Sequence, residues 1–376
     1  MGPTALQQNG QGLGATRVGE YRGATTTARF GDPHREWAQL NAGCGVYDLG
    51  FRAKVSLTGD DRVRWLNGMV TNNIRDLAAA HGVYAFLLNP QGHILGDLYA
   101  YNRGKSITVD TDRSEVERIL TSFDHYIIMD DVEVKNLGDA VTALGIAGPK
   151  AHSVLQRAGI KFPDLQPLQL HEIQCDCDCG CLTCTIVRGD SVVGEACEIW
   201  LAPEHVRSLW DALVAAGGAP VGFEALELQR IVSGIPLYGA DIHERDLPQE
   251  TEQARALNFN KGCYVGQEIV ERIRSRGAVH RKFTGFVMKD GARVAAGAKI
   301  VAGEKEVGEV TSVAHLESGD VKKTLALGYI RREAGVPGRE VSIGGAPATV
   351  AQLPFDLPLL ARELTIEEEP LERHRA

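Results

Sequence analysis

Apolar residues recur at two different spacings along the first two thirds of the chain. Residues 51–59 read as a strand, and Val63, Leu66 and Val70 then follow at helical spacing after the acidic pair at 60–61. The same reading predicts further strands at 83–88, 94–101, 107–109, 127–134, 141–147 and 198–201, and further helices within 112–123, 149–159, 203–217 and 223–232. The pattern therefore predicts a mixed α/β region.

After about Arg281 the pattern changes. Short β-prone runs at 283–289, 307–313, 324–331 and 339–352 are separated by glycine-rich turns, and helical periodicity is lost. This arrangement is typical of a small all-β barrel.

Four regions are expected from these changes in pattern. Residues 1–25 are rich in Gly, Gln and Thr and are expected to form a disordered lead-in. Residues 26–281 form the mixed region, as one body or two subdomains, and residues 282–356 form the barrel. Residues 357–376 form an acidic, solvated tail.

Composition narrows the class of protein. The chain has 376 residues, of which 44% are hydrophobic and 24% charged, and these values are ordinary for a globular protein. A net charge of −9 argues against a general binder of nucleic acid. No apolar run approaches the roughly 20 residues that a membrane helix needs. The N-terminus lacks the basic start and apolar core of a secretory signal. We therefore expect a cytoplasmic protein that contacts neither a membrane nor nucleic acid.

Five of the eight cysteines lie between residues 175 and 184. Cys181 and Cys184 form a C-x-x-C, and on one strand the cysteines at alternate positions 175 to 181 would share a face. Zinc and iron–sulfur sites use such ligands, but structural zinc sites usually join two separated pairs and the chain has no second C-x-x-C. We therefore predict no metal at this cluster.

One short segment concentrates groups with chemical potential. Lys261-Gly262-Cys263-Tyr264-Val265-Gly266-Gln267-Glu268 holds an amine, a thiol and two glycines within eight residues. If the segment is extended, Lys261 and Cys263 point to the same side, and the ammonium would favour the reactive thiolate. The alternative is a buried, inert cysteine beside a solvated basic strand.

The segment KGCYVGQE resembles the signature of the YgfZ family of folate-binding proteins, which are relatives of the glycine-cleavage T-protein, an aminomethyltransferase. The resemblance covers roughly residues 25–355. It implies an α+β, T-protein-like folate-binding fold with a mixed α/β N-terminal region and a C-terminal β-barrel, and it implies tetrahydrofolate or a one-carbon derivative as cofactor. Other stretches that resemble T-protein elements are 46–49, 55–61, 88–98 and 234–242, with Pro248 and Glu250.

The resemblance also implies roles for residues of the signature. Cys263 would act as a nucleophile or a transient sulfur or metal ligand, and Lys261 would lower its pKa. The residues expected to support this pair are Gly262, Tyr264, Gly266, Gln267, Glu268 and the following Arg276.

An aspartate is the first position that the resemblance assigns to the cofactor. T-proteins have paired aspartates where this chain has Gly96 and Asp97, so that Asp97 matches the second. In the family a carboxylate here contacts the folate near its reactive nitrogens. The alternative for Asp97 is an exposed strand residue, since an unpaired buried carboxylate is costly.

Three further residues are cofactor candidates. Glu198 matches the family glutamate that hydrogen-bonds the pterin, and Arg230 matches a family arginine, although Val232 replaces the glutamate that follows it in the pattern. Tyr101 is expected to stack on a ring or to close a hydrogen bond. The alternatives are a surface helix arginine for Arg230 and a core residue for Tyr101.

Three functions remain open from the sequence. The resemblance to YgfZ proteins implies a tetrahydrofolate-binding accessory factor for iron–sulfur cluster assembly or repair and tRNA modification, with iron–sulfur proteins or their assembly factors as partners. The first alternative is an aminomethyltransferase of the glycine-cleavage type, which passes a methylene carbon from a lipoyl carrier to tetrahydrofolate. The second is a non-catalytic folate-binding scaffold.

Overall fold

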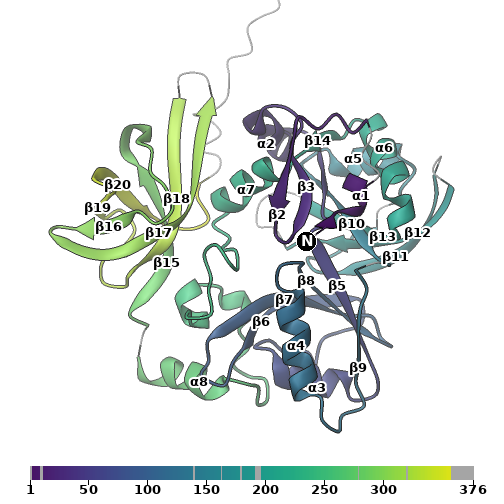
Figure 1. The fold of residues 1–376 in the computed structure, drawn as a ribbon, viewed down its shortest axis with the longest axis horizontal. Coiled ribbons are helices and arrows are strands. Elements are labelled where there is room, and N and C mark those ends of the chain that lie inside the picture. Colours follow the sequence, from purple (N-terminus) through teal and green to yellow (C-terminus); the bar gives the residue numbers. More distant parts are fainter. Residues whose placement is uncertain are drawn as a thin grey trace, which may run out of the picture. The chain divides into compact units, whose positions relative to one another are not determined.

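The chain folds into two compact units. The computed structural model describes residues 2–8, 12–138, 140–161, 163–177, 180–190, 196–277, 279–318 and 321–356 (Figure 1). The first unit comprises Met1–Gln229 and Leu237–His280, and the second comprises Arg230–Pro236 and Arg281–Ala376. The mixed α/β region and the C-terminal barrel predicted from the sequence are both confirmed.

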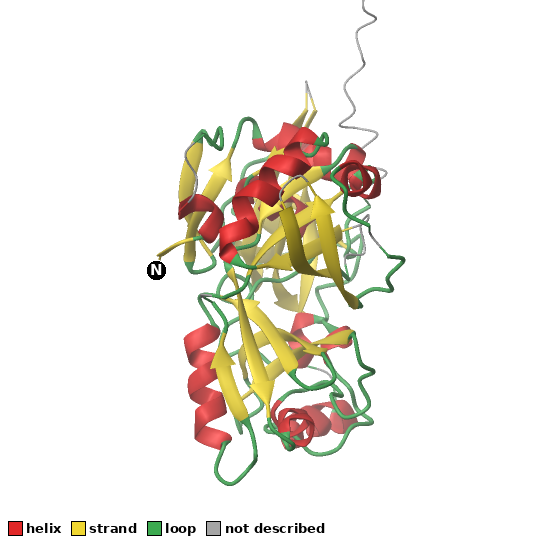
Figure 2. Cartoon of the chain, turned by 90° about the vertical axis from the view of Figure 1, so that its right-hand side faces the viewer, coloured by secondary structure: helices red, strands yellow, loops and turns green. Residues whose placement is uncertain are grey.

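A five-stranded sheet forms one layer of the first unit. Two helices, α3 (Arg62–Met69) and α4 (Val116–Tyr126), pack their apolar sides on it, as Figure 2 shows for the helices (red) beside these strands. The order of its strands is β6 (His81–Leu88), β7 (Ile94–Asn102), β8 (Ile107–Asp112), β5 (Arg52–Thr58) and β9 (Glu133–Asn136).

The two faces of this sheet differ in chemistry because side chains alternate along each strand. Val55, Leu98 and Val109 point into the core beneath the helices. Their neighbours Lys54 and Asp110 point to the opposite face. The sheet therefore buries one apolar face and presents a polar one, which carries the candidate site.

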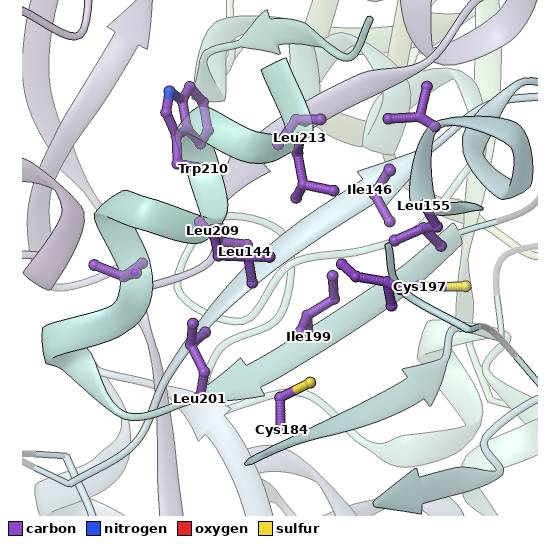
Figure 3. Packing of buried hydrophobic residues seen from close by; sticks show 14 of the residues in the cluster. Leu144, Ile146, Leu155, Cys184, Cys197, Ile199, Leu201, Leu209, Trp210 and Leu213 are labelled. Atoms are coloured by element: carbon purple, nitrogen blue, oxygen red, sulfur yellow. The ribbon is translucent and has the colours of Figure 1, made fainter. Parts of the chain in front are cut away.

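A six-stranded sheet forms the second large layer. Helices α5 (Ala151–Arg157) and α6 (Val206–Ala215) cover one face, and Figure 3 shows Leu209, Trp210 and Leu213 of α6 beside Leu144 and Ile199 of the sheet. Its order is β11 (Leu170–Cys177), β12 (Gly180–Arg188), β13 (Ala196–Leu201), β10 (Thr142–Ala147), β4 (Gly45–Asp48) and β14 (Ala219–Val221).

The described residues of the segment expected to be a disordered lead-in form regular elements. Helix α1 (Ala5–Gln8) buries Leu6, and a small sheet has the order β1 (Gly2–Pro3), β3 (Ala24–Arg29) and β2 (Arg17–Tyr21). Thr26 Oγ1 donates a hydrogen bond of 2.7 Å to the buried Asp48 of the six-stranded sheet. Polar threonines are therefore ordered here because buried partners satisfy their hydroxyls.

A second difference concerns the strand expected at 127–134. Only β9, Glu133–Asn136, pairs with the sheet. Ile128 and Met129 are 82% and 94% exposed and lie in the loop after α4, so their apolar character did not indicate a buried strand.

The remaining helices lie between the strands along the chain. Asp32 caps α2 (Pro33–Ala42) by accepting hydrogen bonds from the backbone of His34 and Arg35. Helices α7 (Phe223–Val232) and α8 (Gln267–Arg276) and the 3₁₀ turns η1 (Pro203–His205), η2 (Pro248–Thr251), η3 (Ala254–Ala256) and η4 (Lys289–Gly291) complete the described helices. No helix in the described part of the chain is long and apolar enough to cross a membrane.

The second unit is a closed barrel. Phe286, Ile300, Ile330 and Val350 fill its interior from alternate positions of its strands. Closure leaves the strands without an open edge, which explains why the short β-prone runs are stable together. The order is β15 (Arg281–Met288), β18 (Val321–Arg331), β17 (Lys305–Ser318), β16 (Lys299–Ala302), β19 (Glu340–Ile343) and β20 (Ala346–Ala351).

Candidate functional site

A cavity of about 220 Å³ lies on the polar face of the five-stranded sheet, within the first unit. Its wall combines aromatic rings with charged side chains from both large sheets, the composition expected of a small-molecule site. The residues that line it are Tyr21, Arg22, Leu49, Phe51, Arg52, Tyr99, Tyr101, Leu168, Gly189, Asp190, Glu198 and Leu226.

A row of paired residues crosses four strands of the five-stranded sheet. Tyr84 pairs with Tyr99, and Tyr99 pairs with Asp110. Asp110 in turn pairs with Lys54. Residues directly opposite in antiparallel strands share a face, so these four side chains stand on the same side of the sheet. Lys54 Nζ lies 2.8 Å from Asp110 Oδ1, and each of these two side chains is 1% exposed.

Arg52 adds a second cation to Asp110. Arg52 Nη2 lies 3.2 Å from Asp110 Oδ2, and its Nη1 lies 2.5 Å from Asp112 Oδ1. Burial acts to raise the pKa of Asp110, but the charges of Arg52 and Lys54 outweigh burial and hold that pKa below its usual value. Asp110 is therefore a carboxylate that stays ionised inside the protein.

Glu198 brings a second carboxylate to the cavity from β13. It lies two residues before Trp200, so both side chains occupy one face, and Trp200 Nε1 donates a hydrogen bond of 2.7 Å to Glu198 Oε2. Opposite Glu198 on β10 is Gly145, where a Cβ would lie 1.9 Å from the Tyr47 ring. The glycine thus makes room for Tyr47 beside the glutamate.

The pKa of Glu198 reflects its surroundings. Burial raises this pKa above the usual value, and the charge of Asp110 adds to the rise. Lys54, the hydrogen bond from Trp200 and the charge of Arg52 act in the opposite direction. Glu198 is therefore a carboxyl group whose protonation depends on the groups packed around it.

Tyr101 forms part of the aromatic wall. Its ring meets the Trp200 ring edge-on with centroids 5.2 Å apart, and its side chain is 2% exposed. Gly82 pairs with Tyr101 across the sheet, and a Cβ on Gly82 would lie 2.4 Å from the Tyr101 ring. Tyr101 therefore lines the cavity and is also a buried core residue, and its stacking on a ligand ring stays a prediction.

Arg22 reaches the cavity from a tight turn. Arg22 and Gly23 both have positive φ, 48° and 87°, and join β2 to β3 as a two-residue hairpin. The guanidinium lies 4.9 Å from the Tyr21 ring centroid and 5.5 Å from that of Phe51. Its Nε is buried and has no hydrogen-bond partner among the described residues. Arg22 therefore brings a buried hydrogen-bond donor without a described partner to the wall of the cavity.

Asp97 lies on the same face of β7 as Tyr99 but is not among the residues that line the cavity. Tyr84 Oη donates a hydrogen bond of 2.6 Å to Asp97 Oδ2. Burial raises the pKa of Asp97, and the charge of Asp112 adds to this rise. Asp97 is thus neither a simple exposed strand residue nor a part of the cavity lining.

Lys261 and Cys263, the two main residues of the signature segment, lie in different environments. Lys261 is buried, and its Nζ donates to the backbone carbonyls of Asn67 and Val70 at the end of α3. Cys263 is exposed and does not line the cavity. Lys261 lies at a bend, residues 262–264 have no regular secondary structure and residues 265–266 form a turn, so the alternation of a strand that would bring ammonium and thiol together does not apply.

Other residues of the segment have packing roles. The Tyr264 ring lies 4.7 Å from Lys261 Nζ. Gly266 has φ of 81° at the start of α8, and a Cβ there would lie 2.5 Å from the Asn89 carbonyl oxygen. Gln267 begins the helix and Glu268 is an exposed acidic residue in its first turn, where the helix dipole favours negative charge.

Gly262 and Arg276 were also expected to support the pair of Lys261 and Cys263. Gly262 is exposed, with nothing within 4 Å of a Cβ built on it. Arg276 is the last residue of α8, and its side chain lies outside the described structure.

Arg230 is not among the residues that line the cavity. It is buried and belongs to the second unit, where Nη1 donates a hydrogen bond of 2.7 Å to the Ile235 carbonyl and Nη2 one of 2.9 Å to Ser312 Oγ. These contacts correct the alternative of a surface arginine and give Arg230 a structural role in its unit.

Sequence reasoning missed the charged residues of the polar face. Arg52 and Lys54 are two residues apart on β5, and Asp110 and Asp112 are two apart on β8, each pair separated by a buried residue. Charged residues at alternate positions of otherwise apolar strands were the available signal. Their pairing could not be seen because the strands lie far apart in the sequence.

The cysteine cluster lies mostly outside the described structure. The side chains of Cys175, Cys177, Cys179 and Cys181 are not described, and the segment forms a hairpin of β11 and β12 rather than one strand. Cys184 is buried in the core of the six-stranded sheet. The residues that are described contain no group of three or more metal-ligating side chains.

Comparison with known proteins gives consistent matches. The sequence matches the GCVT N-terminal domain over residues 9–261 and the glycine cleavage T-protein C-terminal barrel domain over residues 281–356. An aminomethyltransferase of Streptomyces coelicolor is 29% identical over 368 residues, covering 94% of this chain and 96% of that protein. One of Rubrobacter xylanophilus is 28% identical, covering 94% and 93%.

A solved structure shares the fold. The glycine cleavage system aminomethyltransferase T from Bartonella henselae is similar with a TM-score of 0.83 and 22% identity, covering 94% of this chain and 97% of that chain.

These matches overturn one interpretation of the sequence. The expectation of an accessory factor for iron–sulfur cluster assembly and tRNA modification is wrong, because relatives that match along 94% of the chain are aminomethyltransferases. The two domain matches cover both units in order. The chain belongs to the glycine cleavage T-protein family.

Proposed function

We propose that the protein is a folate-dependent aminomethyltransferase of the glycine-cleavage type, and that it binds tetrahydrofolate in the cavity lined by Glu198 and Tyr101. The observation that carries the proposal is this cavity, where a half-buried carboxyl group with a raised pKa meets a wall of aromatic rings. The similarity to aminomethyltransferases over 94% of the chain supports it.

The groups around the cavity fit the chemistry of a reduced folate. The aminopyrimidine edge of a pterin presents N–H donors, and Glu198 offers carboxylate acceptors. Tyr99 and Phe51 offer flat apolar faces against which a ring can pack. The unpaired Nε of Arg22 offers a donor to an acceptor atom of the ligand.

Tetrahydrofolate, when bound, supplies the nitrogens that take up the methylene carbon. The overall reaction converts an aminomethyl thioether on a lipoyl carrier into the free thiol, releases ammonia and leaves the carbon on the folate. Glu198 binds and orients the ring. Asp97, hydrogen-bonded to Tyr84 and with its pKa raised by burial, is suited to hold and pass a proton on the sheet face that also carries the cavity residue Tyr99.

The proposal is tested first by binding. We expect tetrahydrofolate to bind the wild-type protein in anaerobic titration calorimetry, and Glu198→Gln to weaken binding about tenfold or more, because an amide offers only one acceptor oxygen to the two donors of the pterin. Glu204→Gln, at an exposed residue of η1, is the matched control and should bind as the wild type does. Equal affinity in wild type and Glu198→Gln would reject the assignment of Glu198.

Turnover is the second readout. The wild-type protein, supplied with tetrahydrofolate and an aminomethylated lipoyl carrier protein, should release one ammonia for each methylene carbon transferred. A protein that binds tetrahydrofolate but releases no ammonia would instead support the non-catalytic folate-binding scaffold.

The finer assignment to the YgfZ branch remains a proposal that rests on the segment KGCYVGQE. The contacts of Lys261 and Gly266 give this segment a packing role that requires no iron–sulfur chemistry.

A further inference from the structure

A continuous path of side chains links the two large sheets beside the cavity. Lys54 Nζ lies 2.8 Å from Asp110 Oδ1 on one side and 4.7 Å from the centroid of the Trp200 ring on the other. Trp200 Nε1 then donates a hydrogen bond of 2.7 Å to Glu198 Oε2. The path therefore runs from a buried ion pair on the five-stranded sheet to the carboxyl group that lines the cavity.

Lys54 is one of two cations that neutralise Asp110. Arg52 already lies 3.2 Å from Asp110 Oδ2 and donates from its Nε to Asp110 Oδ1 at 3.2 Å. A buried lysine is costly, and apolar residues of similar volume often replace buried ion pairs without loss of stability. The Lys54 ammonium also contacts the face of the Trp200 indole, and Arg52 does not duplicate this contact.

We propose that Lys54 is a positioning residue, which holds the Trp200 indole so that Glu198 presents an ionised, correctly oriented carboxylate to the cavity. The cavity then selects a ligand whose ring edge carries two adjacent hydrogen-bond donors, as an aminopyrimidine does. The identity of that ligand rests on the proposed function, whereas the action of Lys54 on Glu198 does not.

Groups from several described strands act on Glu198. Lys54 and Arg52 from β5 and the indole N–H of Trp200 favour the ionised carboxylate, and Asp110 from β8 opposes it. Tyr47 from β4 and Tyr101 from β7 are neutral neighbours whose own pKa values are raised by burial and by Glu198. Removal of Lys54 and removal of the Asp110 charge should therefore act on Glu198 in opposite directions.

The test measures the titration of Glu198 in the protein without ligand. Infrared absorption of the protonated carboxyl group, taken as the difference from Glu198→Gln, gives the pH midpoint. We expect Lys54→Met to raise this midpoint by about one pH unit, and Asp110→Asn to lower it by a similar amount. Lys135→Met, the same change at an exposed residue of β9, should leave it unchanged.

Tetrahydrofolate affinity is measured in parallel against pH. Lys54→Met should weaken binding about tenfold near neutral pH, and the pH dependence of binding should shift with the Glu198 midpoint.

If neither Lys54→Met nor Asp110→Asn moves the midpoint, the inference is wrong, whatever the folate affinity. If the midpoints shift as expected but the wild type binds no folate, the proposed function fails and the role of Lys54 stands. If Lys54→Met does not fold, Asp110→Asn provides the test. A pH midpoint of Glu198 that is not lowered in Asp110→Asn would then overturn the inference.

Discussion

Lys261 shows how one side chain can stabilise an element that is distant in sequence. Its ammonium has no role beside Cys263. It donates hydrogen bonds to the carbonyls of Asn67 and Val70, which have no intrahelical partners at the C-terminal end of α3. The ring of Tyr264 covers the same ammonium.

We predict that Lys261→Met destabilises the protein in a pH-dependent way. Burial lowers the pKa of Lys261 to about 7, from an ordinary value of 10.5. Between these values the unfolded chain binds a proton that the folded protein lacks, so this group's contribution to stability rises with pH, by up to about 1.4 kcal/mol per pH unit, and is lost as pH falls toward 7. The loss in Lys261→Met should therefore be larger near pH 9 than near pH 6.

Urea unfolding of both proteins at several pH values checks this prediction. Near pH 9 we expect Lys261→Met to lower the free energy of unfolding by about 1–3 kcal/mol, because two buried carbonyls lose their donor. A difference between the proteins that stays constant from pH 6 to pH 9 would contradict the lowered pKa.

At the scale of elements, the turn before α8 depends on close backbone contact. Gly266 adopts φ of 81° directly against the turn that contains Asn89 and Gly92. Gly92 has φ of 76°, and a Cβ on it would lie 2.7 Å from Ile269 Cβ in α8. Two glycines, one on each segment, thus allow the start of the helix to pack on the hairpin between β6 and β7.

Alanine substitution separates this role from simple flexibility. We expect Gly266→Ala to destabilise the protein by about 2 kcal/mol or more, from the left-handed conformation and from the contact 2.5 Å from the Asn89 carbonyl. Gly262→Ala lies four residues earlier, where a Cβ meets nothing within 4 Å, and should change stability by less than about 0.5 kcal/mol. Thermal and urea unfolding of the two variants provide the comparison, and equal stabilities would refute the packing argument.

The elements that could be predicted from the sequence are those whose pattern is local. The apolar spacing of α3 and α4 follows directly from burial of one helix face on the sheet, and the short barrel strands alternate as barrels require. The strand expected at 127–134 failed because Ile128 and Met129 are apolar but exposed. Periodicity reports which residues are apolar, whereas burial depends on neighbours from elsewhere in the chain.

For the whole molecule, the candidate site depends on pairings across long sequence distances. Glu198 was singled out by its resemblance to a family element. Its link to Lys54 through Trp200, however, joins residues that lie far apart in the sequence. The register of β5 with β8 places Lys54 opposite Asp110, and Glu198 and Trp200 lie two residues apart on β13. Sequence alone shows alternating charges on each strand, and the structure determines which of them meet.

Arg230 belongs to the second of the two units into which the chain divides. Helix α7 ends in Arg230–Val232, which belongs to the second unit, and the Arg230 guanidinium bonds the Ile235 carbonyl and Ser312 of the barrel strand β17. We expect Arg230→Met to lower the stability of the second unit by about 1–3 kcal/mol, since these buried acceptors lose their donor. Hydrogen exchange should accelerate in β15, β17 and β18, while exchange in the five-stranded sheet and the affinity for tetrahydrofolate should stay unchanged. Conversely, a loss of folate affinity without faster exchange in the barrel would return Arg230 to the ligand-binding role that the family resemblance assigned to it.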